Sequence, residues 1–270
     1  MKTMPYAAGQ GELGIYYEVH GSGSTVVFIH GGNGNTLSWI HQIPYFSRDH
    51  QCIAIDLRGF KNSKCPIEQY EAKFMAADLL AVLDHAGIKR AALVCQSLGA
   101  WAGLPVAVRH PERVSAIVIN GSPTPVYSER NWALMARATK VTQAIQRGEL
   151  PRAKASGMSE GYMREQPVLT YLYEAIGLLN GPRRTETMMD DACKLLPEDF
   201  EGYEVPTLLT GGQHDHFLTP DHHIHIAGLI PGAQTHTFQH SGHSAYWEEP
   251  DEFNRIVLEF LTNCGWSSAG

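Results

Sequence analysis

The stretch Ala91-Ala92-Leu93-Val94-Cys95-Gln96-Ser97-Leu98-Gly99-Ala100-Trp101 decides the fold. It begins with small and β-branched residues, a run typical of a strand buried on both faces. A helical pattern follows from about Ser97 to His110, and a proline then ends it. A strand that turns into a helix within three residues needs small neighbours beside the turn, here Cys95 and Gly99. The side chain of Ser97 then stands above a helix N-terminus, which favours negative charge.

The rest of the chain alternates strands with helices, which predicts the α/β class with a doubly wound, mostly parallel sheet. The predicted strands are 13–20, 25–29, 51–55, 91–95, 114–119, 205–210 and 234–238. The predicted helices of the sheet layers are 37–46, 74–86, 97–110, 220–229 and 249–262. The interval between 123 and 204 shows helical patterns only, at 132–147, 159–165, 168–179 and 184–195. We therefore expect a core domain of residues 1–123 and 204–270, with a helical insertion of residues 124–203.

Composition limits the possible functions. A chain of 270 residues with 43% hydrophobic residues can bury a full core as one domain with an inserted subdomain. The net charge is −7 and the basic residues are scattered, so we expect no nucleic acid partner. No apolar run could span a bilayer, and Met1-Lys2-Thr3-Met4-Pro5 lacks the apolar segment of a signal peptide, so we expect no membrane association. Five widely spaced cysteines fit reduced thiols in a cytoplasmic protein.

The order small-x-Ser-x-Gly between a strand and a helix resembles the nucleophile elbow of the α/β-hydrolase superfamily. Cys95 stands where that family usually has glycine, but cysteine is still a small residue. The helical insertion after the sixth strand resembles the cap of many family members. The resemblance covers nearly the whole chain, and it implies an α/β-hydrolase fold with Ser97 as the nucleophile. Such a serine needs a base within hydrogen-bond reach and a group that orients the base.

The family order of nucleophile, acid and histidine points to two further segments. The segment 208–220 is a strand followed by a glycine-rich loop, and it resembles the loop that supplies the acid, here Asp215. The segment 239–250 resembles the family's Gly-His loop before the C-terminal helix, which implies His243 as the base. His240 lies three residues too early for that motif. The resemblance therefore implies a catalytic triad of Ser97, Asp215 and His243.

The same resemblance implies an oxyanion hole, which needs two hydrogen-bond donors. One is the backbone N–H of Leu98, directly after the nucleophile. The other comes from His30-Gly31-Gly32-Asn33, where the N–H of Gly32 is preferred and that of Asn33 is close behind. A phosphate-binding loop would instead need Gly-Lys-Ser/Thr, which is absent. We also expect Asn33 and Trp101 to contact substrate, although Trp101 could fill the core instead.

Other residues suggest alternative chemistry. The histidines at 214, 216, 222, 223 and 225 lack the i, i+4 pairing of a zinc site, so we expect solvated side chains and no metal. Cys95 is a nucleophilic residue beside Ser97, but as the last strand residue it should point into packing. Some aromatic and methionine residues of the insertion should line an apolar pocket.

We therefore expect a serine hydrolase that needs no cofactor and acts on a small molecule. It would cleave a carboxylic ester or lactone of a small to medium apolar substrate through an acyl-enzyme. Three alternatives stay open: a C–C bond hydrolase of a diketone-type ring-cleavage product, a cyanohydrin lyase, and a ligand receptor with a retained triad. Epoxide hydrolases and haloalkane dehalogenases use aspartate at the elbow, so Ser97 disfavours both. The sequence leaves the oligomeric state open.

Overall fold

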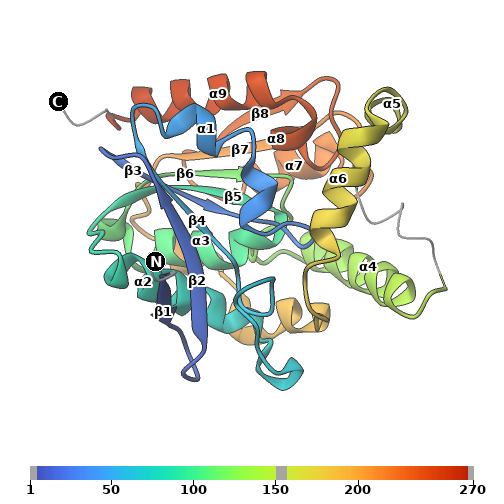
Figure 1. The fold of residues 1–270 in the computed structure, drawn as a ribbon, viewed down its shortest axis with the longest axis horizontal. Helices are drawn as coiled ribbons and strands as arrows, with labels where there is room; N and C mark the ends of the chain where they lie inside the picture. Colours follow the sequence, from blue (N-terminus) through green and yellow to red (C-terminus); the bar gives the residue numbers. More distant parts are fainter. Residues whose placement is uncertain (1–4, 150–156, 267–270) are drawn as a thin grey trace.

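The structure is a computed structural model that describes residues 5–149 and 157–266. Its strands are β1 (Tyr6–Ala8), β2 (Gly14–His20), β3 (Thr25–Ile29), β4 (Gln51–Ile55), β5 (Ala91–Gln96), β6 (Val114–Asn120), β7 (Thr207–Gly212) and β8 (Gln234–Phe238). They form one sheet in the order β1-β2-β4-β3-β5-β6-β7-β8 (Figure 1). β2 is antiparallel to β1 and to β4, and the other neighbours pair in parallel. The predicted mostly parallel sheet is therefore confirmed.

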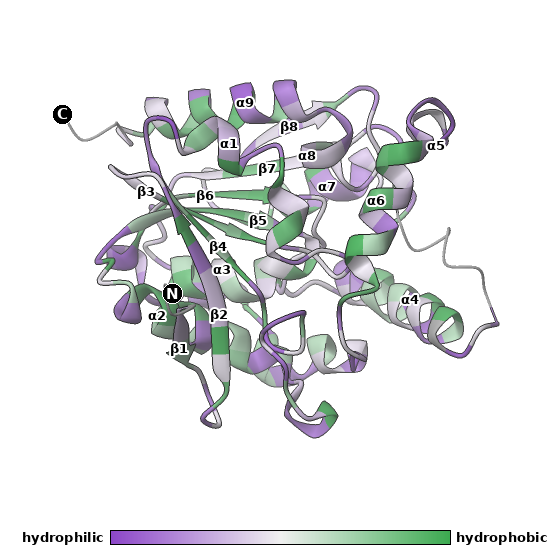
Figure 2. Cartoon of the chain, in the orientation of Figure 1, coloured by the Kyte–Doolittle hydropathy of each residue, from purple (hydrophilic) through white to green (hydrophobic). Residues whose placement is uncertain are grey.

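Helices cover both faces of this sheet. They are α1 (Ile43–Phe46), α2 (Met75–His85), α3 (Ala100–Arg109), α4 (Glu129–Gln146), α5 (Glu160–Glu165), α6 (Pro167–Gly177), α7 (Pro220–Ala227), α8 (Ala245–Glu248) and α9 (Pro250–Asn263). Short 3-10 segments are η1 (Thr36–Trp39), η2 (Ile67–Gln69), η3 (Ala72–Phe74), η4 (Ser97–Gly99), η5 (Pro111–Arg113), η7 (Thr185–Met189), η8 (Asp191–Cys193) and η9 (Pro197–Phe200). One buried cluster joins the sheet to α2, α3 and α7, and a second joins it to α1, α8 and α9. Figure 2 shows hydrophobic central strands and a hydrophilic outer side on α9.

Two predicted helices are wrong in extent, and each is interrupted for a local reason. The predicted helix 37–46 is split into η1 and α1, because Pro44 has no N–H to donate to the carbonyl of Ile40. The predicted helix 184–195 is split into η7 and η8 at Asp190. The Asp190 side chain accepts a hydrogen bond of 3.0 Å from the N–H of Ala192, so it caps a new segment instead of continuing the old one.

Strand boundaries follow the same kind of local chemistry. The predicted strand 205–210 is shifted to β7, which begins at Thr207, because Pro206 cannot donate a ladder hydrogen bond. The carbonyl of Pro206 still accepts one of 2.9 Å from the N–H of Ile117. β1 has only three residues, too few for an alternating pattern to be visible in the sequence, and it was not predicted.

The described residues between β6 and β7 form α4, α5, α6 and the segments η7 to η9. Their one ladder contact is an isolated bridge between Val126 and Leu195. In Figure 1 these helices lie beyond the end of the sheet at which β5 and β6 finish. The division into a core and a helical insertion of residues 124–203 stays a prediction, and residues 150–156 lie outside the described part.

In the described part of the chain, no helix is both long enough and apolar enough to cross a membrane. The expected absence of a signal peptide rests mainly on residues 1–4, which lie outside the described part of the chain. All five cysteines have free thiols.

Candidate active site

Ser97 lies at the sharp turn between β5 and α3. Its φ is +47°, in the left-handed region that non-glycine residues rarely adopt. The turn brings α3 so close to β3 that a side chain on Gly99 would meet the carbonyl oxygen of Ile29. Cys95 is tolerated before the turn because its Sγ faces Gly103, which has no side chain. Burial raises the pKa of the Cys95 thiol, so this cysteine stays neutral.

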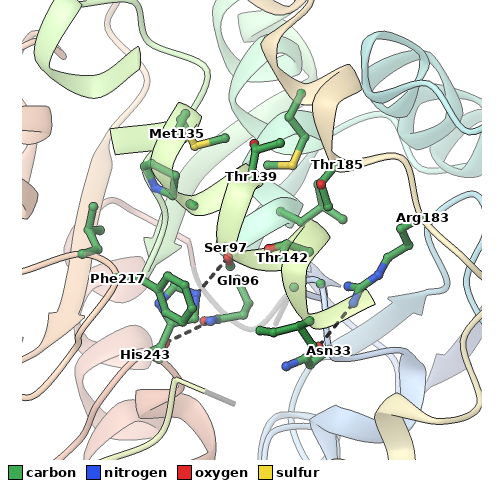
Figure 3. Close-up of a pocket in the computed structure, with 18 of the residues that line it drawn as sticks. Asn33, Gln96, Ser97, Met135, Thr139, Thr142, Arg183, Thr185, Phe217 and His243 are labelled. Carbon is green, nitrogen blue, oxygen red and sulfur yellow. Dashed lines mark hydrogen bonds between the residues drawn. The ribbon is translucent and has the colours of Figure 1, made fainter. Parts of the chain in front are cut away.

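The structure brings the three predicted triad residues together (Figure 3 shows Ser97 and His243). The Nδ1 of His243 lies 2.7 Å from Asp215 Oδ2, and its Nε2 lies 2.9 Å from Ser97 Oγ. Asp215 is 3% exposed, and its other oxygen accepts hydrogen bonds from the N–H groups of Phe217 (2.7 Å) and Leu218 (3.0 Å). Because the carboxylate can only accept, Nδ1 carries the proton and Nε2 is left to accept the Ser97 hydroxyl.

The environment of His243 favours its protonated form. Burial by itself lowers the pKa of this imidazole, but the charge and hydrogen bond of Asp215, with the charge of Glu248, outweigh it and raise the pKa above 6.5. Proton transfer from Ser97 to Nε2 is therefore easier than it would be to an isolated buried histidine.

The loop that carries His243 is held by contacts that the sequence did not predict. The buried carboxylate of Glu248 accepts hydrogen bonds from the N–H groups of Gly242 (2.9 Å), Ser244 (3.2 Å) and Ser159 (2.9 Å). The N–H of His243 also donates to the carbonyl of Gly157 at 2.6 Å. These bonds tie both sides of His243 to the segment that precedes α5. The sequence gives no signal for the bonds of Gly157 and Ser159, since their partners lie more than 80 residues further along the chain.

A second set of polar side chains lies behind His243. Gln96 Nε2 donates to the carbonyl of His243 at 3.0 Å, while Gln96 Oε1 accepts from Asn120 Nδ2. Thr210 Oγ1 in turn donates to Asn120 Oδ1 at 2.8 Å. All three side chains are buried at the carboxyl ends of neighbouring strands. Polar residues at the ends of apolar strands were a signal that could have revealed this network.

The predicted oxyanion donors also line the same pocket. Gly32 and Leu98 both contribute to its wall, and in the described part of the chain no hydrogen bond uses their N–H groups. His30 supports this loop: Nδ1 lies 2.8 Å from the Gly31 carbonyl, and Nε2 accepts from the N–H of Leu57 at 3.0 Å. Burial lowers the pKa of His30 to about 3, so the imidazole stays neutral and keeps both bonds.

The pocket above Ser97 is a cavity of about 160 Å³. In Figure 3, Met135 and Phe217 lie on the His243 side, whereas Asn33, Arg183 and Thr185 lie opposite. The helix α4 supplies one wall through residues three or four positions apart, namely Met135, Ala138, Thr139, Thr142 and Ile145. Of the aromatic and methionine residues between β6 and β7, Met135, Tyr173 and Met188 line the pocket.

Asn33 lies in the pocket wall, whereas Trp101 does not. Trp101 is 2% exposed within the core, and its Nε1 donates to the carbonyl of Met188 at 3.1 Å. It is absent from the described residues that line the pocket. The structure thus corrects the prediction that Trp101 contacts substrate. Trp101 is instead a core residue, the alternative that the sequence left open, and its indole N–H is already bonded to the carbonyl of Met188.

The prediction of solvated side chains is wrong for two of the five histidines, whereas His214 and His216 are exposed as expected. His222 and His223 are buried, at 6% and 1% exposure, because α7 packs this side against the sheet. Burial lowers the pKa of His222 to about 4 and also lowers that of His223. No group of three potential metal ligands comes together among the described residues.

Comparisons with known proteins agree with this geometry. The family model described as alpha/beta hydrolase fold matches residues 24–147 and 144–250. The chain is 30% identical to an Azorhizobium caulinodans protein named "Putative carbamate hydrolase RutD", covering 97% of this chain and 98% of that protein. It is 26% identical to a 2-hydroxy-6-oxo-6-phenylhexa-2,4-dienoate hydrolase of Comamonas testosteroni, covering 92% and 91%.

A solved structure of Est816, described as an N-acyl homoserine lactone degrading enzyme, superposes with a TM-score of 0.74. It is 26% identical and covers 95% of this chain and 100% of its own. The family model and the first relative both extend over most of the chain, including the segments that carry Ser97, Asp215 and His243. The chain therefore belongs to the α/β-hydrolase fold family, and it is a hydrolase of that family.

Proposed function

We propose that this protein is a serine hydrolase that cleaves a carboxylic ester or lactone through an acyl-enzyme. The observation that carries the proposal is the position of His243 within hydrogen-bond reach of both Ser97 Oγ (2.9 Å) and Asp215 Oδ2 (2.7 Å). A base bound on both sides in this way can take the serine proton and keep the orientation needed to return it.

In the proposed reaction, Ser97 Oγ attacks the substrate carbonyl while His243 Nε2 takes its proton. The N–H groups of Gly32 and Leu98 bind the oxyanion, and Asp215 stabilises the imidazolium. His243 then protonates the leaving alkoxide, which departs and leaves an ester bond between the acyl group and Ser97. Water, activated by the same histidine, hydrolyses that ester and restores the serine. Every proton is carried by His243, so these steps need no metal or cofactor.

The pocket supports a small substrate. A cavity of about 160 Å³ compares with engineered cavities of about 150 Å³ that hold a benzene molecule. The face of α4 that meets it is mostly apolar or small, which suits a short alkyl or aryl group.

Steady-state hydrolysis of p-nitrophenyl esters from acetate to laurate tests the proposal, with wild type and Ser97→Ala compared. We expect turnover that is greatest for short acyl chains and is lost by about 10³-fold or more in Ser97→Ala. The proposal would be contradicted if wild type hydrolysed none of these esters, or if Ser97→Ala were as active as wild type.

A C–C bond hydrolase is the second candidate, because a relative with 26% identity over 92% of this chain is named as the hydrolase of a 2-hydroxy-6-oxo-dienoate. The same triad would then cleave a bond next to a ketone. Loss of the visible absorbance of a 2-hydroxy-6-oxo-dienoate, in the absence of ester turnover, would favour this candidate over the first.

A further inference from the structure

Two buried hydroxyl groups in the pocket wall lack hydrogen-bond partners within the described residues. They are Tyr70 Oη and Thr185 Oγ1. Tyr70 is 1% exposed, and burial raises the pKa of its phenol to about 12, so the hydroxyl keeps its proton and can donate. Buried polar groups are normally hydrogen-bonded, because leaving one unpaired in the protein interior is unfavourable. Both residues line the pocket, so a molecule bound there is one source of the missing acceptors.

Arg183 lies beside them. Its guanidinium stacks on Phe60 at 5.6 Å, and the Tyr70 ring lies 6.2 Å from the same phenylalanine. Figure 3 shows Arg183 and Thr185 on the same side of the pocket, opposite His243. Among the described residues that line this pocket, Arg183 is the one with a permanent positive charge, and none carries a carboxylate. This part of the pocket, made by Tyr70, Arg183 and Thr185, is called the polar end below.

We propose that the polar end binds a carboxylate of the substrate, so that the enzyme acts on esters or lactones that carry a second, anionic group. The inference rests on the proposed function and names the substrate class more closely. A carboxylate has two acceptor oxygens in one plane, which match the fork of a guanidinium and leave lone pairs for the two hydroxyl groups. The neutral apolar substrate expected from the sequence would leave Tyr70 and Thr185 unpaired.

The position of Arg183 also limits the distance between the two substrate groups. Its Nη1 lies 2.7 Å from the position that a Cβ on Gly32 would occupy. Gly32 is the proposed oxyanion donor, so the carboxylate and the scissile carbonyl bind within a few bonds of each other. Half-esters of short dicarboxylic acids, and lactones with a carboxylate substituent, have this spacing.

The test compares two esters of equal chain length, the mono-p-nitrophenyl ester of glutaric acid and p-nitrophenyl pentanoate, with the uncatalysed rates subtracted. We expect wild type to have a kcat/KM at least about tenfold higher for the anionic ester, because hydrogen bonds to charged groups are the stronger ones. Arg183→Met should lower kcat/KM for the anionic ester by about 10- to 100-fold and that for the neutral ester by less than about threefold.

Arg184→Met is the matched control. Arg184 carries the same charge one residue further along, but it pairs with Glu71 at 3.1 Å and is not among the pocket residues. We expect this variant to keep the wild-type preference between the two esters. Tyr70→Phe and Thr185→Val should each lower kcat/KM for the anionic ester by about two- to tenfold. Tyr70→Phe removes one oxygen atom, and Thr185→Val exchanges a hydroxyl for a methyl group of similar volume. If Arg183→Met does not fold, these two variants test the carboxylate site in its place.

A binding measurement separates this inference from the proposed reaction. Calorimetric titration of Ser97→Ala with glutarate should show binding that the additional Arg183→Met substitution weakens by at least about tenfold. If both esters are hydrolysed without preference and Arg183→Met lowers both rates alike, the carboxylate site is wrong and the ester hydrolase stands. If glutarate binds through Arg183 but neither ester is hydrolysed, the carboxylate site stands and the proposed reaction is wrong.

Discussion

The backbone N–H of His243 donates a hydrogen bond of 2.6 Å to the carbonyl oxygen of Gly157. This bond joins the proposed catalytic base directly to the segment between β6 and β7. Gly157 has a φ of +64°, and a Cβ at this position would collide with the His243 side chain. The segment between β6 and β7 therefore both contributes to the pocket wall and holds the proposed base.

Replacing Gly157 with alanine should reduce catalysis more than stability. The new methyl group displaces His243 from Ser97, and a displacement of about 1 Å can lower the rate about 100-fold. We expect kcat for a p-nitrophenyl ester to fall by about tenfold or more. Gly148→Ala is the control, because Gly148 has a similar φ of +76° but no heavy atom of the described residues within 4 Å of its Cβ position. Equal kcat values in the two variants would show that Gly157 does not position the base.

The activity should depend on pH through His243. The imidazole must be neutral to accept the Ser97 proton, and its pKa is raised above 6.5 by Asp215 against the opposing effect of burial. We expect kcat/KM to fall as the pH drops through a midpoint above 6.5. Asp215→Asn removes the raising charge, so it should move this midpoint to lower pH and reduce kcat by about 10³- to 10⁴-fold. A midpoint that is the same in both proteins would contradict the assignment of Asp215.

The same pKa shift makes a prediction about stability with the opposite sign. A group whose pKa is higher in the folded state binds its proton more tightly there. The stabilisation from His243 is thus fully present below pH 6.5 and is lost as the pH rises through the raised pKa. Chemical denaturation at pH 5.5 and 8.5 measures this contribution to the free energy of unfolding. The part of the change between the two pH values that comes from His243 should be smaller in Asp215→Asn than in wild type. An equal change in both would contradict the pairing.

Trp101→Phe should affect stability without affecting substrate binding. The substitution removes the hydrogen bond of 3.1 Å from Nε1 to the Met188 carbonyl, and one such bond contributes about 1 kcal/mol. For a chain of this size we expect Tm to fall by about 2–4 °C or somewhat more through lost packing. KM for short p-nitrophenyl esters should stay within about twofold of wild type. A large rise in KM with unchanged Tm would restore Trp101 as a substrate contact.

The central part of the fold could be predicted because buried parallel strands are short apolar runs bounded by clear turn residues. Val26, Val27 and Phe28 belong to such a run, and the strand that contains them has the predicted bounds. The helix over 37–46 could not be predicted correctly from apolar spacing, because a single missing N–H at Pro44 interrupts it. Such a break depends on backbone hydrogen bonding, which the spacing of apolar residues does not report.

The candidate triad was accessible because its residues stand in local motifs, at strand ends, in a fixed order. The supports of the triad were not, since Gly157 and Glu248 belong to no motif and reach their partners, His243 and Ser159, only in the folded chain. The polar end of the pocket was hidden for the same reason: Tyr70 and Arg183 come from segments more than 100 residues apart. What the sequence lacks is the placement of the segment between β6 and β7 relative to the sheet, and this placement determines the pocket wall.

The measurement that tests the central claim most directly is the mass of the protein after rapid mixing with p-nitrophenyl acetate and an acid quench. The account predicts an added acetyl group that maps to Ser97, appears equally in Cys95→Ala and disappears in Ser97→Ala. Cys95 is the informative control, because it is the nearest other nucleophile in sequence and burial raises the pKa of its thiol. An adduct on Cys95, or ester turnover that persists in Ser97→Ala, would contradict the account.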